Sequence, residues 1–207
     1  MSYQNVLSSR VARGTVRTLG QQEELPLLRD HLLRLDRDSR HDRFHGFMDD
    51  SFIERYAARC ANDGTVVIAY LEDGAVRGAA ELHLPDQSPS SEPEVAFSVE
   101  SGLRRQGVGS ILFRRLIAEA RARGYRSLRI TTGAQNDAMR ALAHKFGAHL
   151  TFRHGESTGS IDLSRQGQVE PARLWIAAPL EATRAMVNFN RAYWKFLLRM
   201  YGLGRAA

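Results

Sequence analysis

The sequence predicts an α+β domain in which a mixed, mostly antiparallel β-sheet is flanked by helices. Three observations predict it. A run rich in β-branched residues, 65–71, and a returning segment, 75–84, are separated by the turn residues Glu72-Asp73-Gly74, which is typical of an antiparallel hairpin. An apolar strand ending at Val99, an amphipathic helix from Gly107 and a further strand then form one crossover unit. After one more helix, two short β segments complete the order ββ–βαβ–αββ.

Each element is indicated by its own local signal. Apolar residues at helical spacing, Asp or Asn caps and closing glycines mark the helices. Runs of β-branched residues mark the strands. Helices are predicted over residues 23–35, from Asp49 or Asp50 to about Cys60, over 107–123, and from Asn136 to Gly147. Strands are predicted over residues 14–19, 65–71, 75–84, 95–99, 127–132, 150–153 and 159–163.

Composition indicates a globular, intracellular protein. The 207 residues fit one domain of about 150 residues and an extension. No apolar run approaches ~18 residues and no leader pattern opens the chain, so we expect neither secretion nor a membrane span. The single cysteine, Cys60, excludes an internal disulfide and is expected to be a buried, inert thiol in a reducing cytoplasm. The seven histidines lack zinc-ligand spacing, so we expect no metal site.

The C-terminal segment differs in composition from the rest of the chain. We expect residues 1–163 to form the main domain, 164–179 a linker, and 180–207 an amphipathic basic and aromatic helix. Residues 180–207 supply +4 of the net charge of +6, so the nearly neutral remainder gives little support to nucleic-acid binding. We expect this helix to pack on its own domain or in a homodimer, with a membrane surface or nucleic acid as further alternatives.

The segment Arg104-Arg105-Gln106-Gly107-Val108-Gly109 lies between the strand ending at Val99 and the helix that follows it. Gly107 and Gly109 let backbone N–H groups approach an anion, and the helix start adds unpaired donors and the positive end of its dipole. A phosphate-bearing ligand would suit this segment, although glycines also serve as plain helix caps. The patterns of nucleotide triphosphatases and of dinucleotide-binding folds are not present.

Over roughly residues 14–163 the chain resembles the GNAT superfamily of acyl-CoA-dependent N-acetyltransferases. Two motifs carry the resemblance: Arg104-x-x-Gly107-x-Gly109, and Asn136-x-x-Met139-x-x-Leu142-x-x-Lys145-x-Gly147 about 30 residues later. It implies the GNAT fold, with a sheet that splays between its fourth and fifth strands, and acetyl-CoA as cofactor, released as coenzyme A. The residues implied in cofactor binding are Phe97, Ser98 and Val99 on the strand, Arg104, Arg105, Gln106, Gly107, Val108, Gly109 and Ser110 in the loop, and Asn136.

Two points within this resemblance stay open. Asn136 is expected either to contact the cofactor or to cap its helix. Many family members have a tyrosine that protonates the leaving thiolate where this chain has Ala143. A thiol has a pKa of about 8.5, so coenzyme A can leave as a thiolate and such an acid is dispensable.

Glu94 is the preferred candidate for the general base that deprotonates the acceptor amine. Alternation places Glu94, Ala96 and Ser98 on one face of the strand, away from the core-facing Val95 and its neighbours. The pattern Glu-Val-Ala-Phe-x-Val resembles the bacterial protein-lysine acetyltransferase branch, which has its catalytic glutamate here. Glu81 on the neighbouring strand is the runner-up, followed by Glu100, a histidine or solvent, and a solvated strand-end carboxylate is the non-functional alternative.

The segment from Ser39 to Phe44 lies between the first two predicted helices and is similar to a Ser-Arg-x-x-Arg-Phe segment of the same branch. Arg40 and Arg43 are expected either to bind an acidic acceptor or to be solvated on the surface. Taken together, we expect a cytoplasmic N-acetyltransferase that transfers acetyl from acetyl-CoA directly to a primary amine, with protein lysine favoured. The alternatives are a small-molecule amine acetyltransferase and a non-catalytic acyl-CoA-binding regulatory domain.

Overall fold

The computed structural model describes residues 14–20, 23–85, 92–153 and 155–164. The chain divides into two units, Met1–Gln168 and Val169–Ala207, and all of the described residues belong to the first. The helix predicted over 180–207, and with it the predicted homodimer contact, lies outside the described residues.

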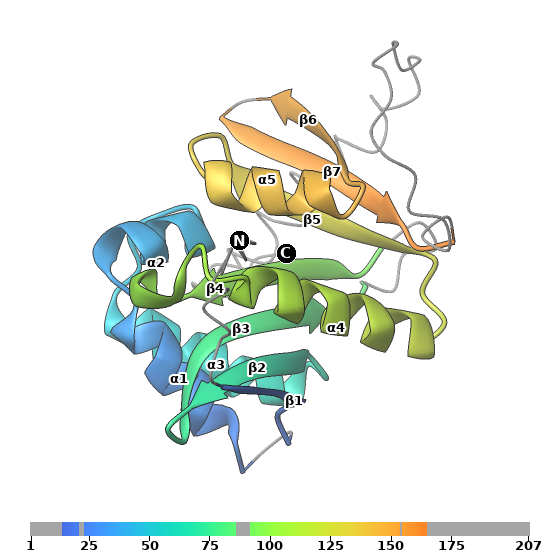
Figure 1. Cartoon of the computed structure of the whole chain (residues 1–207). Helices are drawn as coiled ribbons and strands as arrows, with labels where there is room; N and C mark the ends of the chain where they lie inside the picture. Colours follow the sequence, from blue (N-terminus) through green and yellow to red (C-terminus); the bar gives the residue numbers. More distant parts are fainter. Residues whose placement is uncertain (1–13, 21–22, 86–91, 154, 165–207) are drawn as a thin grey trace, which may run out of the picture. The chain divides into compact units, whose positions relative to one another are not determined.

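The described strands form one seven-stranded sheet in the order β1-β2-β3-β4-β5-β7-β6 (Figure 1). Only β4 and β5 are parallel, which confirms the mixed, mostly antiparallel sheet and the single crossover unit. The strands are β1 (Thr15–Thr18), β2 (Val66–Glu72), β3 (Ala75–His83), β4 (Glu94–Val99), β5 (Ser127–Gly133), β6 (His149–Arg153) and β7 (Glu156–Asp162).

Helices cover both faces of the sheet: α4 and α5 lie on one face, and α1 and α3 on the other (Figure 1). Asp49 caps α3 by accepting a hydrogen bond from Phe52 N at 2.7 Å, so the first of the two predicted caps is the one used. The described helices are α1 (Leu25–Arg34), α2 (Arg37–Phe44), α3 (Asp50–Asn62), α4 (Val108–Ala122) and α5 (Asp137–Lys145), with a 3-10 turn, η1 (Ser101–Leu103), after β4. None of the described helices is both long and apolar enough to cross a bilayer.

The main core lies between the sheet and helices α4 and α5. Its fully buried side chains include Leu112 and Leu116 of α4, and Leu128 and Ile130 of β5. Three aromatic rings stack across it, since Phe113 lies 4.7 Å from Phe97 and 4.5 Å from Phe146 between ring centroids. This stack joins β4, α4 and the end of α5.

The sheet separates between β4 and β5, as predicted. The parallel register holds for only two pairs, Glu94 with Arg129 and Val95 with Ile130, and Arg129 N donates to the Pro93 carbonyl at 2.9 Å. Beyond Ile130, strand β5 continues to Gly133 in pairing with β7, while β4 continues to Val99 in pairing with β3. The carboxyl-terminal halves of β4 and β5 therefore have no ladder between them.

Candidate active site

The gap between β4 and β5 exposes backbone groups of alternate β4 residues. Glu100 N donates to the Arg77 carbonyl at 3.0 Å, which assigns the even-numbered β4 residues to the hydrogen-bonded pairs with β3. The N–H groups of Phe97 and Val99 consequently point toward β5, where the ladder has ended. The backbone of Ser98 pairs with β3, so of the three predicted strand contacts, Phe97 and Val99 direct their N–H groups into the gap.

An anion cradle lies at the start of α4, next to the end of β4. Gly107 has φ +87°, a left-handed conformation that favours glycine, and a side chain there would have open space around its Cβ. Ile111 is the first α4 residue whose N–H is bonded, to the Gly107 carbonyl at 3.1 Å. Within the described residues, the N–H groups of Val108, Gly109 and Ser110 have no acceptor, as first-turn donors typically do not. These residues fit a phosphate-bearing ligand.

The close approach of α5 to α4 brings a lysine to this cradle. The Lys145 ammonium donates to Ser110 Oγ at 3.0 Å. A Cβ added at Gly109 would lie 3.3 Å from Leu142 of α5, so glycine there allows the two helices to approach. Arg105 is exposed and has φ +61°, which is unusual for a residue with a side chain. Arg105 and Lys145 are therefore the cations at the cradle.

Arg104 and Gln106 have other contacts. The Arg104 guanidinium donates to the Val99 carbonyl at 3.2 Å and to Ser39 Oγ of α2. Gln106 Nε2 donates to the Gly102 carbonyl at 2.8 Å. Both side chains thus brace the loop, and Arg104 ties it to α2.

Asn136 caps α5, because its Oδ1 accepts a hydrogen bond from Met139 N at 2.9 Å. Of its two predicted roles, the structure shows this one. Ala143 of the same helix is fully buried in the main core. The position at which a tyrosine would stand in related sequences is therefore part of the packed interior.

Glu94 lies at the start of β4, on the opposite face of the sheet from α4. Its register partners are His83 on β3 and Arg129 on β5, and it is half-buried. Ala96 follows on the same face, so the carboxylate lies two residues along the strand from the point where β4 and β5 separate.

Glu81, the other candidate base, is engaged in a buried cluster. Its Oε2 accepts hydrogen bonds from Arg43 at 2.8 Å and from the Tyr56 hydroxyl, and the His83 Nε2 lies 3.1 Å from that hydroxyl. Burial opposes the charged form of Glu81, but the Arg43 guanidinium outweighs it and holds the pKa of this carboxyl well below its usual range. Among the described residues, Arg43 Nε and Glu81 Oε1 lack hydrogen-bond partners. A carboxylate this strongly stabilised is a poor proton acceptor.

These features agree with the comparison of the chain to known protein families. Residues 30–148, more than half of the chain, match the acetyltransferase (GNAT) family. The chain belongs to the GNAT acetyltransferase family. Acetyl-CoA is the cofactor of these N-acetyltransferases and amines are their acceptors, so the cradle at Gly107 and the gap beside Phe97 fit the pyrophosphate and the pantetheine arm.

Solved structures of GNAT proteins share the fold. The GNAT domain of S. lividans PAT is 22% identical, with a TM-score of 0.61 over 72% of this chain and 90% of that one. YncA, a putative acetyltransferase from Salmonella typhimurium determined with its cofactor acetyl-CoA, is 18% identical, with a TM-score of 0.55 over 78% of this chain and 99% of that one. A ribosomal-protein-alanine N-acetyltransferase from Brucella melitensis is 22% identical, with a TM-score of 0.54 over 70% and 96% of the two chains.

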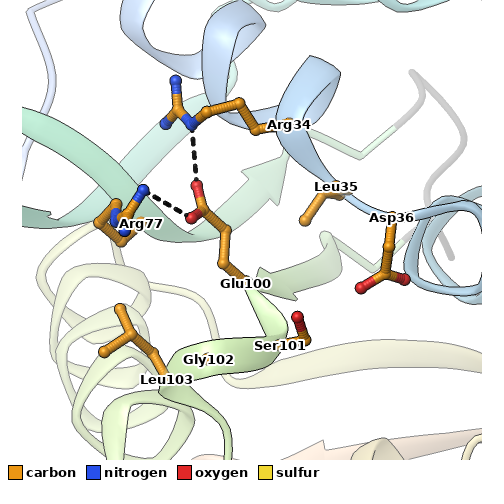
Figure 2. Close-up of a pocket in the computed structure, with 8 residues that line it drawn as sticks. All are labelled: Arg34, Leu35, Asp36, Arg77, Glu100, Ser101, Gly102 and Leu103. Atoms are coloured by element: carbon orange, nitrogen blue, oxygen red, sulfur yellow. Dashed lines mark hydrogen bonds and ion pairs between the residues drawn. The ribbon is translucent and has the colours of Figure 1, made fainter.

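Glu100 directly follows β4 and is the centre of a second polar cluster. Figure 2 shows its carboxylate between Arg34, at 3.1 Å, and Arg77, at 2.9 Å, beside a cavity of about 240 Å³. His31 is fully buried and bridges Glu100, at 3.3 Å, and Ser98 Oγ, at 2.9 Å. Although burial would raise the pKa of Glu100, hydrogen bonds from His31 and Arg34 hold it below its usual range. Glu100 therefore fastens α1 to β4.

The segment from Ser39 to Phe44, expected between the first two predicted helices, belongs to a further helix, α2. Arg43 is only 9% exposed and pairs with Glu81, and Arg40 donates to the carbonyls of Leu33 and Leu35 and to Asp50 Oδ1. The solvated alternative was wrong for Arg43, which is buried against Glu81, and acceptor binding by Arg40 or Arg43 stays a prediction. His45 at its end lies 3.4 Å from Glu156 of β7, so α2 connects the two halves of the separated sheet.

Sequence reasoning missed His31 and His83. His31 lies 67 residues from Ser98 in the chain, and no local pattern indicates their contact. His83 was accessible to reasoning, because the predicted hairpin and the strand from Glu94 place Glu81 and His83 on one face. Cys60 is buried as predicted, and burial raises the pKa of its thiol to about 12. The described residues contain no group of three His, Cys, Asp or Glu side chains that could hold a metal ion.

Proposed function

We propose that this GNAT protein transfers an acetyl group from acetyl-CoA to the side-chain amine of a protein lysine, by direct attack within a ternary complex. The observation that carries the proposal is the early end of the β4–β5 ladder at Val95 and Ile130, next to an anion cradle at Gly107. A thioester arm alongside β4 would receive hydrogen bonds from unpaired strand donors, as an added strand does.

Separate groups of the chain would bind the pyrophosphate and the thioester. The N–H groups of Val108, Gly109 and Ser110, with Arg105 and Lys145, would hold the pyrophosphate. The Phe97 N–H, directed into the gap, would stabilise negative charge on the thioester oxygen. The cofactor supplies an acetyl group activated as a thioester.

Glu94 is the group that would accept the amine proton. An alkylamine with a pKa of about 10.4 is mostly protonated at neutral pH, so attack requires a base. Glu94 is half-buried, on the side of the sheet opposite α4, and two residues from the gap. Glu81 and Glu100 are both paired with cationic side chains, which supports the assignment of Glu94 over these two carboxylates.

An open surface near α2 supports a protein acceptor over a small amine. Phe47, between α2 and α3, is 70% exposed, and the Arg37 guanidinium lies 4.5 Å from its ring centroid. These side chains, with Leu35, Arg40 and Met48, line a hollow of about 440 Å³. An exposed aromatic beside a cation is suited to contact with a polypeptide.

The division into a domain over 1–163, a linker over 164–179 and a helix over 180–207 that joins two copies stays part of the proposal.

The decisive experiment is the Glu94→Gln variant, assayed by free-thiol release from acetyl-CoA with lysine-containing proteins and with small amines. We expect kcat to fall roughly 10²- to 10⁴-fold, as for loss of a general base, while acetyl-CoA affinity by calorimetry is unchanged. Glu54→Gln, at an exposed position on α3, is the matched control and should leave kcat unaltered.

Near-normal turnover of Glu94→Gln would refute the assignment of the base. Initial rates with both substrates varied should give intersecting lines, and parallel lines would refute direct transfer. Tight acetyl-CoA binding without turnover on any acceptor would identify a regulatory domain instead.

A further inference from the structure

Thr132 places an unpaired hydroxyl next to the point where β4 and β5 separate. It is the second residue of β5 beyond the last pair, Val95 with Ile130, and only 1% of it is exposed. Its Oγ1 has no hydrogen-bond partner among the described residues. Arg43 and Glu81 each leave one atom unpaired but bond through others, whereas Oγ1 is the only polar side-chain atom of Thr132. A buried hydroxyl without a hydrogen-bond partner destabilises the fold, so its presence calls for an explanation.

The register fixes where this hydroxyl lies. Continuing the pairs 94 with 129 and 95 with 130 places Thr132 opposite Phe97, across the gap. Alternation along β5 puts Thr132 on the same face as Leu128 and Ile130, the core face covered by α4 and α5. Ala143 is buried in that same core. Thr132 therefore lies on the side of the gap from which a tyrosine at position 143 would approach.

Resting on the proposed function, we propose that the Thr132 hydroxyl donates a hydrogen bond to the sulfur of coenzyme A as the sulfur leaves. Ala143 has no polar side-chain group to offer, and within the part of the chain that the structure describes Thr132 has an unpaired hydroxyl on that face. A hydrogen bond to a charged acceptor is roughly twice as strong as one between neutral groups, so its effect is larger on the thiolate than on the thioester. A contact that strengthens as charge develops accelerates the reaction.

The bond changes balance without a proton from Thr132. The amine nitrogen forms a bond to the carbonyl carbon, the carbon–sulfur bond breaks, and its electron pair goes to sulfur. Glu94 takes one proton from the ammonium before attack and passes it to solvent, the nitrogen loses its second proton to Glu94 as the amide forms, and the thiolate takes its proton from solvent after release. Thr132 keeps its own proton, which suits a hydroxyl that is a far weaker acid than a thiol with a pKa of about 8.5.

Other nearby hydroxyls have different positions or partners. Ser98 Oγ is bonded to His31 at 2.9 Å on the opposite face of the sheet. Thr131 Oγ1 is also unpaired among the described residues, but alternation puts it on the face of Arg129 and Glu94, on the acceptor side. Ser157 is the cross-strand neighbour of Thr132 on β7, away from β4, and is likewise buried. Thr131 and Ser157 therefore provide matched controls.

The test measures the pKa of the coenzyme A thiol bound to the protein, from thiolate absorbance in a pH titration with bound S-methyl-coenzyme A as reference. Relative to wild type, Thr132→Val should raise this thiol pKa by about one unit and lower kcat roughly tenfold, with little change in KM for acetyl-CoA. Thr132→Ser restores the hydroxyl and should restore both values. Thr131→Val and Ser157→Ala should leave the thiol pKa as in wild type.

An unchanged thiol pKa in folded Thr132→Val would overturn the proposal, as would an equal shift in Ser157→Ala. The titration needs only coenzyme A, so it stands apart from the acceptor and from Glu94. If Glu94→Gln retains activity while the Thr132→Val shift is observed, the base assignment fails and the thiolate donor stands. If coenzyme A does not bind wild type, both proposals fail.

Discussion

Two polar regions of this GNAT domain differ in whether their cationic side chains have anionic partners. Beneath α2, Arg43 and Glu81 neutralise each other within a buried cluster that also holds Tyr56 and His83. At the start of α4, Arg105 and Lys145 stand beside first-turn N–H groups with no anion among the described residues. The first region is deeply buried and the pKa of Glu81 is lowered there, yet the cations without an anionic partner among the described residues lie in the second. Under the proposed function, the ligand site is the region that lacks a counter-charge and not the region with the perturbed carboxylate.

The largest expected effect comes from breaking the buried pair. Glu81→Gln leaves the Arg43 guanidinium buried without an opposite charge, so the free energy of unfolding at pH 7 should fall by about 3–5 kcal/mol, measured by urea denaturation. Glu94→Gln should change it by less than about 0.5 kcal/mol. Equal destabilisation by the two variants would show that the two carboxylates do not differ in this way.

Acid should weaken the same pair. The pKa of Glu81 is lowered in the folded protein, so its contribution to stability is present above the unfolded-state pKa of about 4.3 and is lost as pH falls toward the folded-state value. Below about pH 4 the wild type should lose up to about 1.4 kcal/mol of unfolding free energy per pH unit from this group. The measurement is urea denaturation from pH 7 to pH 3. The difference between wild type and Glu81→Gln should narrow over that range, and a constant difference would contradict the assignment.

The smallest effect is expected from a change at the start of α4, where Arg105 and Lys145 lie. Gly107→Ala forces a side chain into φ +87°, at a cost of about 1–2 kcal/mol. Because the loop relaxes to relieve this strain, coenzyme A binding should weaken roughly 5- to 30-fold in calorimetry. Gly124→Ala imposes a similar conformation, φ +82°, at the other end of α4 and should lower stability without changing affinity. Equal losses of affinity in both variants would mean that the helix as a whole, not the cradle, had been perturbed.

The elements that were predictable carry local signals. The hairpin turn at Asp73-Gly74, the strand before the glycine motif and the cap at Asn136 were all found, because each depends on residues adjacent in the chain. Helix α2 was not found, since Phe44 is its one apolar residue and its polar residues bond to partners far away in the chain. Arg43 contacts Glu81 38 residues later, and Ser39 accepts from Arg104 65 residues later.

The candidate site divides in the same way. The glycine loop and Glu94 were indicated by pattern and resemblance. The contacts of Arg104 with Ser39 and of His31 with Ser98 join residues far apart in the sequence, and the position of Thr132 opposite Phe97 depends on the strand register. Side-chain alternation correctly predicts that Glu94 and Val95 lie on different faces of β4. It does not predict that Glu81 is buried against Arg43. Long-range pairing decides which polar groups are already bonded within the fold.

The backbone of Arg105 has a consequence for engineering this protein. A left-handed conformation at a residue with a side chain costs about 1–2 kcal/mol, and Gly107, two residues on, shows that the loop accommodates glycine. A redesign guided by thermal stability alone would therefore select glycine at position 105 and remove a cation from the loop that we propose to hold the cofactor. Directed evolution of this enzyme for heat resistance should be screened at low acetyl-CoA concentration, so that variants of this kind are rejected.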